Sequence, residues 1–260
     1  MHNDFDNSAK SYDVAFTHSE IGKAQRNRVH HFISEKILST KKLNILEVNC
    51  GTGEDALFFT NNGHKVLATD ISESMVELAK KKNKSESARF IQQDINAITT
   101  ETFSEKFDLI FSNFGGLNCL SLDQLWSFLT ISETLLNSNG ELSLVIMPKE
   151  CLWERFYFSI KGSFKKARRR KSSNPIVANV DGTDVMTWYY NPKEIIPLVE
   201  EKFHVRSIKP IGITIPPSYL ESFFSRKKLL LQILVKIENW FSSKFWAKYA
   251  DHYLIVFQKK

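Results

Sequence analysis

Short apolar runs alternate with helix-type segments through most of the first 150 residues. The runs typical of buried strands lie at 43–48, 65–69, 88–92, 107–112 and 141–147. Helices are predicted at 20–38, 53–62, 72–81 and 121–137, and Asn139-Gly140 is a typical stop for the last of them. Because strands that alternate with helices need crossover connections, this pattern predicts an α/β fold with a parallel sheet and right-handed crossovers.

The turn after the first strand carries the most informative chemistry of the chain. Residues 43–48 lead into a turn that contains Gly51 and Gly53, and helix-forming residues follow from Glu54. A strand, a glycine-rich turn and a helix in this order present free backbone N–H groups and a helix dipole to a ligand. The second strand ends in Asp70, nineteen residues past Gly51, where such folds hold a ribose diol. The sequence therefore predicts a site for a nucleoside-containing cofactor.

Two kinds of cofactor compete for this site. The spacing Gly51-x-Gly53-x-x-Ala56 satisfies the dinucleotide fingerprint, so an NAD-dependent oxidoreductase is one interpretation. Two acidic residues favour a different interpretation of the cofactor site. Glu47 lies within the first strand, where a dinucleotide-binding strand is normally apolar, and Asp94 closes a further strand-like run.

At these positions the sequence resembles the class I S-adenosylmethionine (SAM)-dependent methyltransferases, in particular the ubiquinone/menaquinone-biosynthesis-like branch. The first motif of that family is acid-x-Gly-x-Gly-x-Gly, and residues 47–53 match it except at Asn49. Because Asn adopts the left-handed region more readily than most residues, the turn is expected to keep its shape. The leader segment 9–16 is also similar to that branch, and the resemblance covers residues 5–147 well.

The resemblance implies a single methyltransferase domain over residues 1–260. Its implied core is a Rossmann-like, doubly wound, mostly parallel seven-stranded sheet, with a sixth strand near 203–209 and an antiparallel last strand. The implied parts are a helical leader (1–40), a SAM-binding core (41–147), two aromatic lid insertions (148–191 and 213–250) and the last strand (252–260). A parallel strand ends at the ligand edge and the antiparallel strand begins there, so both insertions are expected over the active site.

The resemblance also implies a set of cofactor contacts. Glu47 would orient the glycine turn and the amino end of the methionine moiety, Asp70 would hold the ribose hydroxyls, and Asp94 would reach the adenine amino group. Further SAM contacts are implied for Tyr12, Arg26, Asn49, Gly51, Gly53, Ile71, Met75, Ile95, Ser112 and Asn113. No metal is expected, because the histidines and cysteines lack the spacing of metal ligands.

The acceptor side of the site is less defined by the sequence. His252 follows Asp251 at the start of the expected last strand, and it is either a general base or half of a structural pair. His18 is a weaker candidate for the base. The aromatic insertions favour a small hydrophobic acceptor that is quinone-, polyketide- or lipid-like, with Trp153, Trp188 and Tyr219 as pocket walls. The atom that is methylated and the oligomeric state stay open. A noncatalytic SAM-binding module that recruits a partner is the alternative function.

The charge pattern disfavours a nucleic-acid substrate. The net charge is +6, and the run 165–171 alone supplies six positive charges. A solvated loop is the first interpretation of this run, a contact with an anionic membrane or an acidic substrate the second, and RNA the third. The apolar stripe at 229–241, which lysines flank, is interpreted as a lid helix, with a pocket wall or an interfacial membrane helix as alternatives.

Three observations predict a cytoplasmic enzyme. No run of eighteen apolar residues could span a membrane. The first residues are polar and lack the basic and apolar regions of a signal peptide. The three cysteines are few and have no metal spacing, which is typical of reduced thiols.

Overall fold

The computed structural model describes residues 6, 9, 12–38, 41–180 and 183–260. Its centre is a seven-stranded sheet with the strand order β3-β2-β1-β4-β5-β9-β8. The strands are β1 (Asn44–Val48), β2 (Lys65–Asp70), β3 (Ala88–Gln92), β4 (Phe107–Ser112), β5 (Leu136–Ile146), β8 (Phe203–Ile211) and β9 (His252–Lys259). β9 is antiparallel to both of its neighbours, and the other strands run in one direction. The predicted mostly parallel sheet with a reversed last strand is thereby confirmed.

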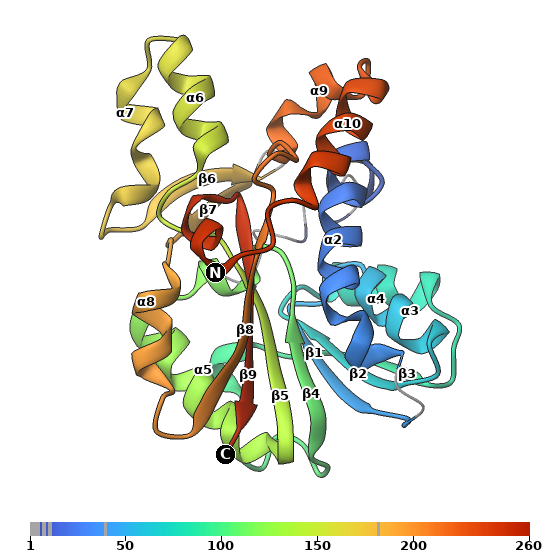
Figure 1. Ribbon diagram of the computed structural model, residues 1–260. Coiled ribbons are helices and arrows are strands. Elements are labelled where there is room, and N and C mark those ends of the chain that lie inside the picture. The colour runs from blue at the N-terminus through green and yellow to red at the C-terminus, as the bar shows by residue number, and fades with distance from the viewer. Residues whose placement is uncertain (1–5, 7–8, 10–11, 39–40, 181–182) are drawn as a thin grey trace.

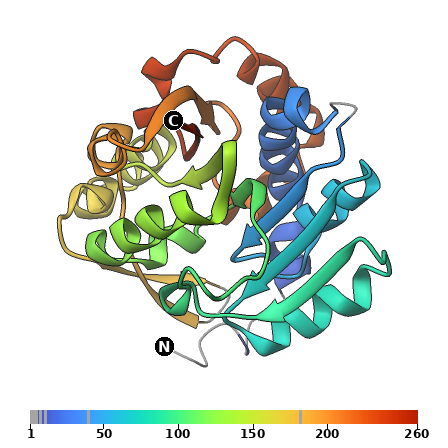
Figure 2. The same cartoon turned by 90° about the horizontal axis from the view of Figure 1, so that it is seen from below.

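Helices cover both faces of this sheet (Figures 1 and 2). The main helices of the core are α2 (Glu20–Ile37), α3 (Glu54–Asn61), α4 (Glu73–Lys82), α5 (Leu122–Leu135) and α8 (Pro192–Ile195). Several of these helices have a side-chain cap at their N-terminus. Ser19 accepts from the N–H of Gly22 at α2, and Ser121 and Gln124 form a capping box at α5.

The hydrophobic core consists of two layers, one on each face of the sheet. One layer packs β-strand residues against α2, α3 and α4, through side chains such as Val29 and Phe59. The other packs the opposite strand faces against α5 and α8. In β1, Ile45 belongs to the first layer and Leu46 to the second, because successive side chains of a strand point to opposite faces.

The segments outside this core lie at one end of the sheet. Segment 148–191 contains α6 (Leu152–Ile160), α7 (Phe164–Ala167) and a hairpin of β6 (Ile176–Val180) and β7 (Thr183–Thr187), and segment 213–250 contains α9 (Glu221–Phe224) and α10 (Lys228–Glu238). Both segments rise beyond the carboxyl ends of the parallel strands (Figure 1). No feature of the sequence pattern predicted this hairpin.

The predicted end of the helix at Asn139-Gly140 is wrong. The helix α5 ends at Leu135 and β5 begins at once, with Asn139 at a φ of 61° inside the strand. The pairing of β4 with β5 shifts register at this point, so the Asn-Gly pair forms an irregularity in a strand instead of a helix stop. Within the described residues, no helix is both long and apolar enough to cross a membrane.

Candidate active site

The glycine turn after β1 adopts the conformation that its sequence predicts. Asn49, Gly51 and Gly53 all have positive φ angles, of 57°, 52° and 80°. Asn49 thus occupies the left-handed region in place of the glycine that the family motif has. Its side chain packs against Gly116, where an added Cβ would lie 2.5 Å from the Cβ of Asn49. The departure from the motif therefore keeps the turn and couples it to the loop after β4.

Glu47 is a buried carboxylic acid beside this turn. It lies in β1, and its Oε2 atom has no hydrogen-bond partner among the residues that the structure describes. Burial raises the pKa of Glu47 well above its ordinary value, and the nearby carboxylate of Asp55 adds to the shift. A cationic group bound at the turn would satisfy this acid and favour its ionised form.

Asp70 ends β2 and binds the backbone around the turn. Its two carboxylate oxygens accept hydrogen bonds from the N–H of Gly51 at 2.8 Å and of Ser72 at 3.0 Å. Asp70 is buried, since only 8% of the residue is accessible. Burial raises the pKa of Asp70, although both N–H groups oppose the shift. Asp70 therefore stabilises the turn whether or not it also binds a ligand.

Asp55 is a central residue of the site that the sequence pattern did not indicate. Its carboxylate contacts the Nε2 atom of His30 at 2.6 Å and the Nε atom of Arg26 at 3.5 Å, and it accepts a hydrogen bond from Asn113 at 3.0 Å. Burial acts to raise the pKa of Asp55, but the charge of Arg26 and the bond with His30 lower it to about 2. The sequence signal that could have identified Asp55 is its position as an acid in the first turn of the helix that follows the glycine turn.

The leader residues lie over the turn. Phe16 packs edge-on against Phe114 at 5.2 Å between ring centroids, and the guanidinium of Arg26 lies 5.5 Å from the centre of the Phe114 ring. Burial raises the pKa of Tyr12 to about 12. Phe114 follows β4 with a φ of 38°, an uncommon conformation for a bulky residue that is often found at functional sites.

These groups surround a small cavity of about 30 Å³. Its lining residues are Tyr12, Arg26, Asn49, Cys50, Gly51, Thr52, Glu54, Asp55, Asn113 and Phe114. The cavity has room for about one water molecule. A nucleoside-sized ligand therefore needs the leader to shift before it can enter.

The remaining predicted cofactor residues lie at the carboxyl ends of β2, β3 and β4. Met75 is buried in α4, and the backbone oxygen of Ile71 accepts a hydrogen bond from Gln92. Asp94 accepts from the N–H of Asn96 at 2.8 Å and caps the short helix that begins at the buried residue Ile95. Ser112 is fully buried, and its hydroxyl has no partner within the described part of the chain.

His252 belongs to a buried polar network next to this site. Its Nδ1 atom lies 3.3 Å from a carboxylate oxygen of Asp251, and its ring contacts Phe114 at 5.2 Å between centroids. Asp251 also accepts hydrogen bonds from Arg170 at 2.7 Å and from Gln25 at 3.0 Å. Burial acts to raise the pKa of Asp251, but the charges of His252 and Arg170 lower it below its ordinary value.

The interpretation of run 165–171 as a solvated loop is wrong in part. Arg170 is buried between Asp251 and Glu154, and Arg169 forms two hydrogen bonds with Glu154. Two buried acids thus draw the end of the run into the protein. The lysines at its start, Lys165 and Lys166, are exposed as predicted.

The three predicted wall residues lie in two different places. Trp153 meets Phe224 at 5.9 Å between ring centroids, and Tyr219 meets Tyr157 at 5.7 Å, so both lie where α6 contacts the segment around α9. Trp188 packs instead against the core layer of α5, and its backbone N–H donates to the backbone oxygen of Asn118. The three side chains therefore do not form one wall.

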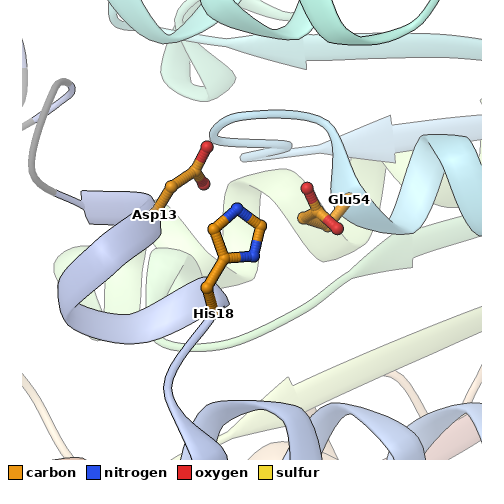
Figure 3. Close-up of side chains that lie close together, drawn as sticks. All are labelled: Asp13, His18 and Glu54. Carbon is orange, nitrogen blue, oxygen red and sulfur yellow. The ribbon is translucent and has the colours of Figure 1, made fainter.

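His18 lies in an acidic cluster at the edge of the leader. Ligand atoms of Asp13, His18 and Glu54 all lie within 4.8 Å of one another (Figure 3). The ammonium of Lys82 forms ion pairs with both acids and lies 2.9 Å from Asp13. Because this cation already compensates the carboxylates, the cluster is an ion-pair network that ties the leader to α3 and α4.

A larger cavity, of about 540 Å³, lies away from the glycine turn. It is a groove between α2 and α10 with apolar side chains such as Leu231 and Val235 and with cations such as Lys23, Lys228 and Lys236. None of the residues that surround the glycine turn lines it.

Comparisons with known proteins agree with this geometry. Residues 45–140 match a family model described as a methyltransferase domain. A malonyl-[acyl-carrier protein] O-methyltransferase of Ilyobacter polytropus is 34% identical over 116 residues, which are 44% of this chain and 40% of the relative. An enzyme of the same name from Bacillus cereus is 24% identical over 237 residues, 88% of this chain and 76% of the relative. The chain thus spans about two fifths of the Ilyobacter relative.

The solved structures show the same fold. Magnesium protoporphyrin IX methyltransferase from Synechocystis, with bound S-adenosylhomocysteine (SAH), superposes with a TM-score of 0.56 at 14% identity, covering 92% of this chain and 83% of the other. The predictions of a class I methyltransferase fold and of a methyltransferase domain around the glycine turn are confirmed. Methyltransferase is the enzyme class that the family model, the relatives and this solved structure share. They do not single out the ubiquinone/menaquinone-like branch.

Proposed function

We propose that this protein is a SAM-dependent methyltransferase whose acceptor is a small, mostly apolar molecule. The observation that carries the proposal is the arrangement around the left-handed turn. Glu47 on β1, Asp70 at the end of β2 and Asn113 after β4 surround backbone that is free to approach a ligand. The unpartnered Oε2 atom of Glu47 fits a ligand with a cationic amino group, which the methionine end of SAM has.

Each part of the site has a separate task in this proposal. SAM supplies a methyl group on a sulfonium, which transfers by in-line displacement, so the protein mainly positions the reactants and excludes water. Glu47 would pair with the amino group, Asp70 with the ribose hydroxyls and Asp94 with the adenine. The leader, with Tyr12 and Arg26, would close over the bound cofactor and keep water out.

His252 is the proposed base for an acceptor that must lose a proton. The ring of Phe114 separates His252 from the cofactor cavity, because Phe114 lines the cavity and contacts the histidine. Asp251 would hold the orientation of His252, and Arg170 would in turn hold Asp251. An acceptor that reacts as a carboxylate would need no such base.

The acceptor is proposed from chemistry and from the relatives. A quinol, which the predicted ubiquinone/menaquinone-like branch favours, fits the proposed apolar acceptor and is the first to test. The names of the relatives add malonyl-[acyl-carrier protein], a protein-bound acyl group, as the second. A reaction in the cytoplasm stays a prediction. All three cysteines lie in the described part of the chain and none forms a disulfide, which is compatible with it.

Transfer of a labelled methyl group tests the function. The protein would be incubated with methyl-labelled SAM and either malonyl-[acyl-carrier protein], a quinol or a cell extract, and the labelled fraction would then be identified. We expect label in an acceptor, with activity lost in Asp70→Asn. SAM binding without transfer to any extract would favour the noncatalytic module. Binding of NAD in place of SAM would favour the oxidoreductase.

A further inference from the structure

The two insertions project as two tips on the same side of the molecule (Figure 1). The first tip is the turn between α6 and α7, residues 160–164, and the second is the turn between α9 and α10 with the first residues of α10, 225–230. Both tips stand beyond the carboxyl ends of the parallel strands, on the side where the glycine turn lies. We call these two segments the lid tips.

Large apolar side chains are exposed at both lid tips. Ile160 and Phe164 are 70% and 66% exposed at the first tip, and Leu229 is 72% exposed at the second. Further exposed apolar side chains next to the tips are Phe156, Phe223, Leu230 and Ile233. Their gathering on two projecting turns marks an interaction surface, because single exposed apolar residues are common but such groups are not.

The charge of the lid tips has one sign. Segments 155–171 and 222–250 contain fourteen Lys and Arg residues but a single acid, Glu238, which is fully buried. The rest of the chain contains more acids than bases. The exposed cations at or beside the tips are Lys161, Lys165, Lys166, Arg226, Lys227 and Lys228. Four of the fourteen, Arg155, Arg169, Arg170 and Lys171, pair with Glu150 or Glu154, so the exposed cations at the tips carry the positive charge beside the apolar side chains.

We propose that the lid tips bind the surface of an anionic lipid bilayer. Exposed apolar side chains that alternate with lysines are suited to this surface, since the apolar groups enter the acyl boundary while the cations meet lipid phosphates. A flat, deformable surface can receive two separate convex tips at once. A folded acidic protein would instead need two apolar pockets at the matching distance.

The lid tips are connected to the acceptor side of the proposed active site. Ring contacts between Trp153 and Phe224 and between Tyr157 and Tyr219 join the two insertions into one body. Docking through the tips would turn the carboxyl ends of the strands toward the bilayer. In so far as the proposed function holds, this favours an amphipathic acceptor that resides in the membrane.

Flotation of the full chain with lipid vesicles, without SAM, tests the proposal. We expect the protein to float with vesicles of phosphatidylglycerol in phosphatidylcholine, less so as salt rises, and not with pure phosphatidylcholine. The variant Lys161→Glu/Lys227→Glu should bind at least tenfold more weakly. Its control, Lys80→Glu/Lys84→Glu, changes two exposed lysines of α4 and of the loop after it and should bind as the wild type does.

A second pair of variants tests the apolar contribution. Ile160→Ser/Leu229→Ser should also weaken vesicle binding at least tenfold, whereas Leu122→Ser/Trp126→Ser, which changes exposed apolar residues of α5, should not. Absence of wild-type flotation with anionic vesicles, or equal binding by tip and control variants, would overturn the proposal. So would tip-dependent binding of an acidic acyl carrier protein without vesicle binding. SAM titrations on the same variants test the proposed function separately, because flotation needs neither cofactor nor turnover.

Discussion

The carboxylate of Asp251 and the guanidinium of Arg170 form a buried ion pair, with 2.7 Å between Oδ1 and Nη2. This pair joins the end of the basic run in the first insertion to the start of β9. The same carboxylate contacts the ring of His252. The orientation of the proposed base therefore depends on a residue that comes 82 positions earlier in the chain.

Asp251→Asn and Arg170→Met separate positioning from stability. Both variants lose the buried ion pair, which should cost about 3–5 kcal/mol of unfolding free energy in each. Asp251→Asn removes the charged partner of His252 directly, whereas Arg170→Met leaves that carboxylate in place and only loosens it, so kcat should fall about 10- to 100-fold further in Asp251→Asn. SAM affinity should stay within a few-fold in both. Equal kcat values would show that Asp251 has a structural role alone.

Asp70→Asn should weaken SAM binding without removing the side chain that supports the turn. Loss of a charged acceptor for the ribose hydroxyls is worth about 1.5–3 kcal/mol, or roughly a 10- to 100-fold rise in Kd. Calorimetry of SAH binding measures this change. Glu73→Gln is the control, since it removes an exposed acid nearby in α4. An unchanged Kd in the folded Asp70→Asn variant would mean that another group holds the ribose.

Asn49→Gly tests the departure from the family motif. Because Asn49 already has a left-handed backbone, glycine should fit without strain, and the Kd for SAH should stay within about threefold. The Nδ2 atom of Asn49 is buried and has no partner among the described residues, so the substitution removes no hydrogen bond of this amide nitrogen. A tenfold weaker Kd, about 1.4 kcal/mol, would instead indicate a direct bond from the Asn side chain to the cofactor.

Glu238→Ala should destabilise the second insertion. The Glu238 carboxylate accepts hydrogen bonds from the backbone N–H groups of Gly212, Ile213, Thr214 and Ile215, and the residue is fully buried. Its loss leaves these donors unpaired, so the unfolding free energy should fall by at least about 3 kcal/mol and Tm by on the order of 5–10 °C. Circular dichroism measures Tm, and the exposed Glu201→Ala is the matched control. Equal Tm values in the two variants would exclude an anchoring role.

The regular part of the fold could be predicted because its signals are local. The strand–turn–helix pattern around Gly51 and the acid at Asp70 depend only on residues close in sequence. The contacts of Asp55 were missed because its partners His30 and Asn113 come from distant segments. The burial of Arg170 was missed for the same reason. A run of six positive charges indicates solvent exposure, and the sequence does not show that the buried acids Glu154 and Asp251 lie beside Arg170. Long-range ion pairing leaves no periodic pattern in a sequence.

Titration of SAM and of NAD into the wild type, each in two buffers with different ionisation enthalpies, tests the central claim most directly. Burial keeps the pKa of Glu47 well above its ordinary value, and a bound amino cation would lower it, so SAM binding should release protons in the pH range between the free and bound pKa values. The release should disappear in Glu47→Gln. We predict SAM binding with proton release and no heat from NAD, whereas NAD binding without SAM binding would contradict the account.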